Sequence, residues 1–172
     1  MPRMQIRCLT PADAAEYQRV RLLALRQDPL SFIASPDEEC DRPLAEVAAQ
    51  LQAGPQGAVV GAFDGDVLVG TCGWRREQPL KLAHKGWVWG VFVAASHRGR
   101  GLARQMLVHV VEIAGGTPGL RQLNLSLHAG NAAALALYAS LGFVEFGREP
   151  AAVQFEGGLF EDVHMVKVLT GP

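Results

Sequence analysis

The stretch "HRGRGLARQML", His97 to Leu107, decides how the chain is interpreted. It follows the uncharged run "WVWGVFVAA", which is typical of a central strand, and it opens a longer amphipathic run. The first amides of a helix have no acceptor inside the helix, and the helix dipole places partial positive charge there. Two glycines and three arginines at this junction therefore predict a cradle for a phosphate or a pyrophosphate. An ordinary arginine-rich turn is the alternative interpretation.

Two common phosphate-binding motifs do not fit this stretch. A Walker loop ends in Gly-Lys-Ser/Thr, which is absent here. A dinucleotide fingerprint needs a third small residue at position 104, where Arg104 stands. The motif therefore indicates a phosphate ligand of another kind.

The composition restricts the class of protein. The 172 residues suit a single domain, residues 1–172, with a core of its own. A formal net charge of −1 argues against nucleic acid or an anionic membrane as a partner. Three cysteines without a Cys-x-x-Cys pair disfavour a disulfide framework and a metal site, so a cytoplasmic protein without metal is expected. The N-terminus has no apolar signal region, and no apolar run reaches the roughly 18 residues of a spanning helix.

The apolar pattern predicts seven strands and four helices in one mixed α/β domain. Thr10 and Asp13 suit the two ends of a capping box at the start of the first helix. Strands are expected at 4–9, at 57–76 as a hairpin around Asp64-Gly65-Asp66, and at 86–94, 120–127, 143–150 and 160–169; helices are expected at 10–27, 44–52, 101–116 and 131–142.

The motifs "VFVAASHRGRGLARQML" and "NAAALALYASLGF" together resemble the GCN5-related N-acetyltransferases, the GNAT family. In the first, Val93, Arg98, Gly101 and Ala103 stand at the family's positions. In the second, the matching positions are those of Asn131, Leu137, Tyr138, Gly142 and Phe143. The motifs come in the family's order with a strand between them, and the order of elements agrees over nearly the whole chain. The resemblance implies a central, mixed but mostly antiparallel sheet flanked by helices.

The resemblance also implies acetyl-CoA as cosubstrate. The pantetheine arm would lie between the central strand and the next one, and the pyrophosphate on the amides of the glycine-arginine turn. Tyr138, seven residues after Asn131, would share its helix face and protonate the leaving thiolate. The implied acetyl-CoA-binding residues are Val91, Phe92, Val93, Arg98, Gly99, Arg100, Gly101, Leu102, Ala103, Arg104, Asn131, Ala134 and Tyr138. A tyrosine packed in the core is the alternative for Tyr138.

The base that deprotonates the acceptor is harder to identify. Many members of the family carry a glutamate on the central strand, whereas "GWVWG" offers only Trp87 and Trp89. His128 ends a strand beside Asn131 and has a suitable ordinary pKa, so it is the candidate, with a packing histidine as the alternative. Glu161 and Asp162 stand near the expected acceptor entrance, whereas His84 is expected to be exposed. Water alone could also serve.

The acceptor is expected at the polar loop "DPLSFIASPDEECD". This loop resembles one in a bacterial branch of the family, in which the first two helices form a wall of the acceptor cleft. Phe32, Glu38 and Glu39 would contact a cationic amine, although a solvated acidic loop is the alternative. The three tryptophans, Trp74, Trp87 and Trp89, could line the cleft, but in a small domain they are more often core.

The sequence therefore predicts an enzyme that moves an acetyl group from acetyl-CoA to a primary amine. A sensor that holds acetyl-CoA or acyl-CoA without chemistry is the second hypothesis, favoured by the missing strand carboxylate. A nucleic-acid binder using Arg98, Arg100 and Arg104 is the third, and the net charge disfavours it. A homodimer is expected only because such assemblies are frequent in the family.

Overall fold

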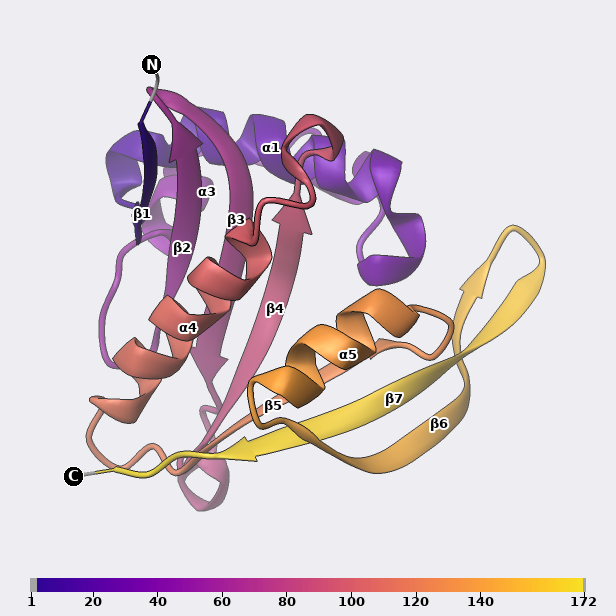
Figure 1. Cartoon of the computed structure of the whole chain (residues 1–172). Coiled ribbons are helices and arrows are strands. Elements are labelled where there is room, and N and C mark those ends of the chain that lie inside the picture. Colours follow the sequence, from indigo (N-terminus) through magenta and orange to yellow (C-terminus); the bar gives the residue numbers. More distant parts are fainter. Residues whose placement is uncertain (1–2, 172) are drawn as a thin grey trace.

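A seven-stranded sheet forms the centre of the protein in a computed structural model that describes residues 3–171 (Figure 1). The strand order is β1-β2-β3-β4-β5-β7-β6, and every neighbouring pair is antiparallel except β4 and β5. The strands are β1 (Met4–Cys8), β2 (Gly57–Asp64), β3 (Val67–Arg76), β4 (Lys85–Val93), β5 (Gln122–His128), β6 (Val144–Phe155) and β7 (Gly158–Val168). The predicted mixed, mostly antiparallel sheet is confirmed.

Four helices of seven or more residues flank the sheet, as predicted. They are α1 (Ala14–Gln27), α3 (Leu44–Gln50), α4 (Leu102–Gly115) and α5 (Ala132–Ser140). A single additional turn, α2 (Pro36–Glu39), lies within the segment that was expected to be an irregular loop. Single 3₁₀ turns occur at η1 (Pro11–Asp13), η2 (Pro29–Ser31), η3 (Leu80–Leu82) and η4 (Ala95–His97).

The helices cover opposite faces of the sheet and enclose two cores. In Figure 1, α4 and α5 lie in front of the sheet, and α1 and α3 lie behind it. Met106, Leu107 and Val110 of α4 are fully buried against the front face. Tyr17, Val20 and Leu25 of α1 are buried against the back face, together with Phe92 of β4. The central strand β4 thus has packed side chains on both faces, which accounts for its uncharged sequence.

The strands β4 and β5 are paired over only three residues. Their partners are Lys85 with Gln122, Gly86 with Leu123, and Trp87 with Asn124. Beyond Trp87 and Asn124 the two strands part, as Figure 1 shows to the right of β4. The register between β3 and β4 also shifts between Thr71 and Gly73, and Gly90 of β4 has a positive φ of 64°. A glycine in this conformation is typical of a β-bulge.

The last hairpin is longer than the sequence pattern indicates. The expected strands were 143–150 and 160–169, but β6 continues to Phe155 and β7 begins at Gly158. The strand passes Pro150 through an irregular register between Glu149 and Val153, with a positive φ at Ala151. A proline is tolerated there because β6 is an edge strand of the sheet.

Within residues 3–171, no helix has the length and apolar character needed to cross a lipid bilayer.

The first helical segment begins with the predicted capping box. The Thr10 backbone N–H donates to Asp13 Oδ2 at 2.7 Å, and Arg7 donates two hydrogen bonds to the same carboxylate at 2.8 Å each. Chiefly because of Arg7, the pKa of Asp13 is lowered from 3.8 to about 2. A lowered pKa means that the protein gains stability from the ionised carboxylate at neutral pH and loses it in acid.

We therefore predict that Asp13→Asn lowers the free energy of unfolding by about 1–2 kcal/mol at neutral pH. The difference from the wild type should persist above the ordinary pKa of 3.8 and shrink as the pH falls toward about 2. Urea unfolding at several pH values measures it, with Asp41→Asn as an exposed control. A difference that does not depend on pH would contradict this account of Asp13.

Candidate functional site

Six consecutive backbone amides at the start of α4 have no acceptor in the described chain. Residues 99–104 donate no backbone hydrogen bond within residues 3–171, and the first bond of the helix runs from Gln105 N–H to Gly101 O at 3.1 Å. Gly99 and Gly101 have positive φ values of 75° and 73°. A Cβ at Gly99 would meet no atom within 4 Å, so the space over this turn is open. These amides, with the positive end of the helix dipole, can hold a diphosphate.

The three arginines of the turn have different surroundings. Arg98 donates to Val93 O at 2.9 Å and forms an ion pair with Asp28 at 2.8 Å, so its side chain ties the turn to the end of β4 and to the end of α1. Arg104 donates to Ser140 Oγ at 2.7 Å and links α4 to α5. Arg100 makes only a long contact of 3.4 Å with Ser96 O. Of the three guanidinium groups, that of Arg100 makes the weakest contact with the rest of the protein and is the most available to a ligand.

The parting of β4 and β5 leaves peptide groups of β4 without a strand partner. Ala94 N–H donates to Val69 O at 2.8 Å, and Phe92 is the register partner of Thr71, so both residues face β3. Because peptide groups alternate in direction along a strand, those of Val91 and Val93 face β5. The Phe92 side chain is buried in the back core. Of the predicted trio, Val91 and Val93 are thus the residues whose backbone faces the gap.

The helix α5 stands beside this gap on the front face of the sheet. Asn131 caps it, with Oδ1 accepting from Ala134 N–H at 3.1 Å. Tyr138 lies two turns further along and is buried, with its ring at 5.9 Å from that of Phe143 in an edge-to-face arrangement. The helix therefore carries Tyr138 into the front core on the side of β4.

The Tyr138 hydroxyl is kept in its protonated form. Burial raises the pKa of Tyr138 well above its ordinary value, and the neighbouring Cys72 thiol adds to the effect. Burial also raises the pKa of Cys72, which is fully buried on β3. A phenol that stays neutral can donate a hydrogen bond to a thiolate formed beside it and pass its proton to the sulfur as the charge develops.

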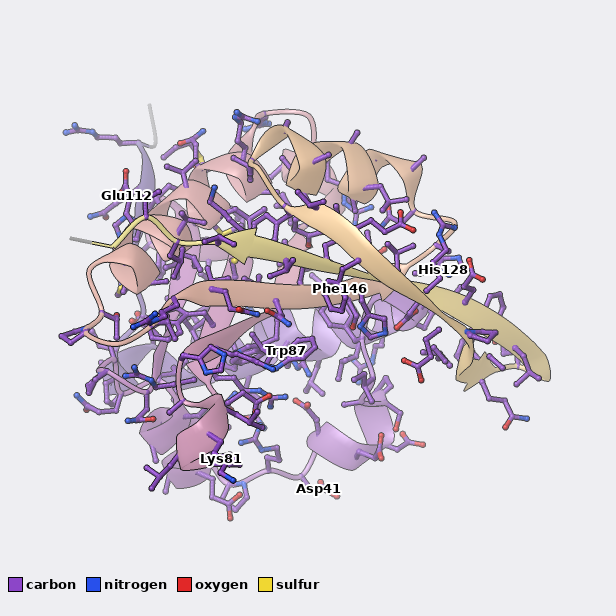
Figure 2. The ribbon with its side chains drawn as sticks, turned by 90° about the horizontal axis from the view of Figure 1, so that it is seen from below. Asp41, Lys81, Trp87, Glu112, His128 and Phe146 are labelled. Carbon is purple, nitrogen blue, oxygen red and sulfur yellow. The ribbon has the colours of Figure 1, made fainter. Side chains whose placement is uncertain are left out.

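The candidate base His128 lies at the far end of β5. Its Nδ1 is buried without a hydrogen-bond partner among the described residues, and its ring packs edge-to-face on Phe160 at 5.5 Å. Asp162 is its register partner on β7, and burial raises the pKa of that carboxyl. Glu161 is paired with Arg148 at 3.1 Å. Figure 2 shows His128 at the end of the sheet near the last hairpin.

His84, which was expected to be exposed, is half-buried. Its carbonyl accepts from the backbone of Arg121 at 2.8 Å, beside the closed end of the β4–β5 pair.

The predicted acceptor wall is anchored to α1. Phe32 is buried, with its ring at 6.5 Å from that of Phe92. Glu39 forms an ion pair with Arg21 at 3.0 Å, in which both side chains are 15% exposed. Glu38 accepts from Ser35 N–H at 2.6 Å and caps α2. Both predicted carboxylates therefore already have a partner inside the protein.

The three tryptophans have separate roles. Trp74 is 1% exposed and belongs to the front core, as the core interpretation predicts. Trp89 packs against the back core beneath Arg21, whose guanidinium lies 5.9 Å from its ring. Trp87 is half-buried, and its indole N–H donates to Glu77 Oε1 at 2.5 Å.

Sequence reasoning missed Glu77, Arg21 and Cys72, whose positions depend on pairing between distant segments.

The comparisons with known proteins identify the family and the fold. The family model described as the acetyltransferase (GNAT) family matches residues 19–143. The fold is similar to that of a GNAT-family acetyltransferase from Streptococcus pneumoniae, with 23% identity, a TM-score of 0.85, and coverage of 97% of this chain and 100% of that one. It is also similar to yncA, a putative acetyltransferase from Salmonella typhimurium solved with acetyl-CoA, with 21% identity, a TM-score of 0.81, and coverage of 99% and 96%.

A third similar structure is the ribosomal-protein-alanine N-acetyltransferase from Brucella melitensis. It shares 24% identity at a TM-score of 0.76, with coverage of 96% of this chain and 99% of that one. No curated protein sequence matches the chain.

The fold and the site thus define an acyl-CoA-dependent acetyltransferase. The chain belongs to the GNAT family, because the family match spans well over half of its length. Within residues 3–171, no group of three or more His, Cys, Asp or Glu side chains is arranged to hold a metal ion.

We predict that Gly101→Ala weakens coenzyme A binding about tenfold, because a left-handed conformation costs an alanine about 1–2 kcal/mol. Gly115→Ala in the same helix is the matched control, since it has open space and no positive φ. Calorimetry with coenzyme A and with pantetheine, which lacks the diphosphate, separates the two parts of the ligand. Equal loss for both ligands would count against a diphosphate at this turn.

Proposed function

We propose that this acetyltransferase moves an acetyl group from acetyl-CoA to a primary amine by direct attack in a ternary complex. The observation that carries the proposal is the row of unpartnered amides at residues 99–104, which stands beside the parted strands and the buried Tyr138. Structures solved with acetyl-CoA, such as that of yncA, support acetyl-CoA as the donor.

The donor would lie along the gap between β4 and β5. Its diphosphate would accept hydrogen bonds from the amides of Gly99, Arg100, Gly101, Leu102, Ala103 and Arg104, and Arg100 has the freest side chain to add charge. The pantetheine amides would pair with the backbone of Val91 and Val93 in the manner of an added strand. The Asn131 side-chain N–H₂ remains available to the pantetheine arm because its oxygen is used by the helix cap beside Ala134.

The chemistry follows from this placement. The neutral amine nitrogen attacks the thioester carbonyl carbon and forms a C–N bond, and the carbonyl electrons move to an oxyanion. A backbone N–H of β4 near Val91 would donate a hydrogen bond to this oxyanion. When the C–S bond breaks, its electron pair goes to sulfur, and Tyr138 donates its proton there. The nitrogen, which still carries one proton more than the amide, releases that proton to solvent, and a proton from solvent restores the neutral Tyr138. The raised pKa of Tyr138 keeps that proton in place until the thiolate forms.

The ammonium form of the acceptor must first lose a proton. His128 is the proposed acceptor of that proton, by way of a water molecule, with Asp162 opposite it in the register. Asp162 can stabilise the imidazolium that forms, since the two residues influence each other electrostatically. On the side of the α1–α2 segment, Phe32 would contact the acceptor, and Glu38 and Glu39 would lie at the edge of the acceptor site.

A sensor that binds acetyl-CoA without turnover is the second candidate. The feature that favours it is the stretch Gly86–Gly90 on β4, which offers Trp87 and Trp89 but no carboxylate, whereas many family members carry a glutamate on this strand. An acetyl-CoA turnover screen against a panel of primary amines, which measures free thiol, distinguishes the two. We expect amine-dependent thiol release; coenzyme A binding without release for any amine would support the sensor.

We predict that Tyr138→Phe lowers kcat about 10²- to 10⁴-fold, the usual contribution of a general acid. The affinity for coenzyme A should stay nearly unchanged, because the ring and its packing on Phe143 are retained. Tyr17→Phe is the matched control, since the only other tyrosine is also buried, with its pKa raised to about 12, but lies in α1. Unaltered turnover in Tyr138→Phe would remove Tyr138 from the mechanism.

A further inference from the structure

Two half-buried carboxylates in the described chain have no ion-pair partner. The other half-buried acidic side chains within residues 3–171 are each paired with an arginine or a histidine, as Asp28 is with Arg98 and Asp64 with His97. The two exceptions are Glu77 and Asp162. A partly buried charge that is not in an ion pair can gain from a bound cation, so each of these carboxylates is a candidate for a cationic ligand.

Glu77 is held in place by a neutral partner. It follows directly on β3, where its backbone N–H donates to Lys85 O at 3.0 Å. Its side chain accepts the indole N–H of Trp87 at 2.5 Å. This hydrogen bond fixes the carboxylate without neutralising its charge, which is the arrangement expected of a group that binds a cation.

Trp87 places this carboxylate beside the gap. Trp87 and Asn124 form the last pair between β4 and β5 before the strands part. The neighbours of Trp87 on β4, Gly86 and Val88, face the front core with Leu123, so Trp87 projects from the back face of the sheet. Figure 2, seen from below, shows Trp87 on the side of the sheet away from α5. That back face also carries the α1–α2 segment proposed as the acceptor wall.

We propose that Glu77 binds a second positive charge of the acceptor, and this inference rests on the proposed function. Val91 lies four residues after Trp87, about 13 Å along the strand, so the Glu77 carboxylate held by the Trp87 indole is roughly that far from the reacting end of the gap. At that distance Glu77 is too remote to take a proton from the attacking amine. The favoured acceptor is therefore a primary amine that carries another cationic group about 13 Å away.

Other charges on this face must be considered. Lys85 stands directly opposite Glu77 in the register and Arg75 directly opposite Trp87, yet neither forms an ion pair with Glu77 in the described chain. Asp162 differs from Glu77, because His128 and His164 lie near enough to lower the pKa of its carboxyl against the effect of burial. Among the described residues, the side chain of Glu77 is held only by the neutral indole of Trp87, which makes Glu77 the stronger candidate for a cationic ligand.

The test compares acceptors that differ only in the second charge. A short and a long α,ω-diaminoalkane are each assayed beside the monoamine of the same length, with acetyl-CoA as donor. In the wild type we expect kcat/KM for the long diamine to exceed that of its monoamine about tenfold or more, as for a charge-assisted hydrogen bond. Glu77→Gln should remove this advantage and leave monoamine turnover unchanged. The exposed Glu112→Gln, on the outside of α4, is the control.

The possible outcomes separate a failure of the proposed function from a failure of the role of Glu77. If no amine is acetylated by the wild type, the proposed function fails. If amines are acetylated but Glu77→Gln treats the long diamine as the wild type does, only the role of Glu77 fails. If Lys85 already neutralises Glu77, Glu77→Gln will lower the thermal midpoint without changing the diamine preference, and the inference is overturned. Trp87→Phe, which removes the indole donor, should reduce the diamine preference in part while leaving the affinity for coenzyme A unchanged.

Discussion

The separation of β4 from β5 after three residue pairs is the constraint on which the site depends. A parallel pair that stays closed would use the peptide groups of Val91 and Val93 in the sheet. Because the strands part, the peptide groups of Val91 and the N–H of Val93 have no strand partner, while Val93 O accepts from Arg98 and the rest of the sheet remains hydrogen-bonded. The cost of this opening is limited by the antiparallel ladder of β3 on one side of β4 and that of β7 on the far side of β5. An extended ligand arm can then take the place of the missing strand.

The turn after β4 continues this arrangement. Positive φ values at Gly99 and Gly101 direct successive amides to one side, and α4 contributes its free first turn. The Arg98 guanidinium donates to Val93 O and pairs with Asp28, so it holds the turn against the ends of β4 and α1. The turn is therefore stiffened by one arginine, and the amides remain available to a ligand. Backbone groups on a rigid element are suited to a diphosphate, since little ordering is needed on binding.

The two faces of the sheet differ in polarity. The front face, with α4 and α5, is apolar around Tyr138, and this low-polarity setting keeps the phenol protonated. The back face carries titratable and charged groups: Glu77, Asp162, two histidines and the Arg21–Glu39 pair. A thioester held in the gap would have the Tyr138 phenol, a proton donor, on the front side. On the back side it would have the charged groups past which an amine could approach. This division follows from the period-two alternation of β4, which sends Val88 forward and Trp87 and Trp89 backward.

The sequence by itself determined the order of elements, the glycine-arginine turn, the Asn131 cap and the shared helix face of Asn131 and Tyr138. These depend on local rules, namely hydrophobic period, capping and glycine conformation, that act over a few residues. Gly90 lies inside an apolar strand, and this local feature could also have predicted the β-bulge. Only the tertiary structure decided that Arg98 is bound to Asp28, that Glu39 is bound to Arg21, and that Glu77 reaches Trp87. Each of these contacts depends on how separate elements pack against one another, so no nearby spacing encodes them.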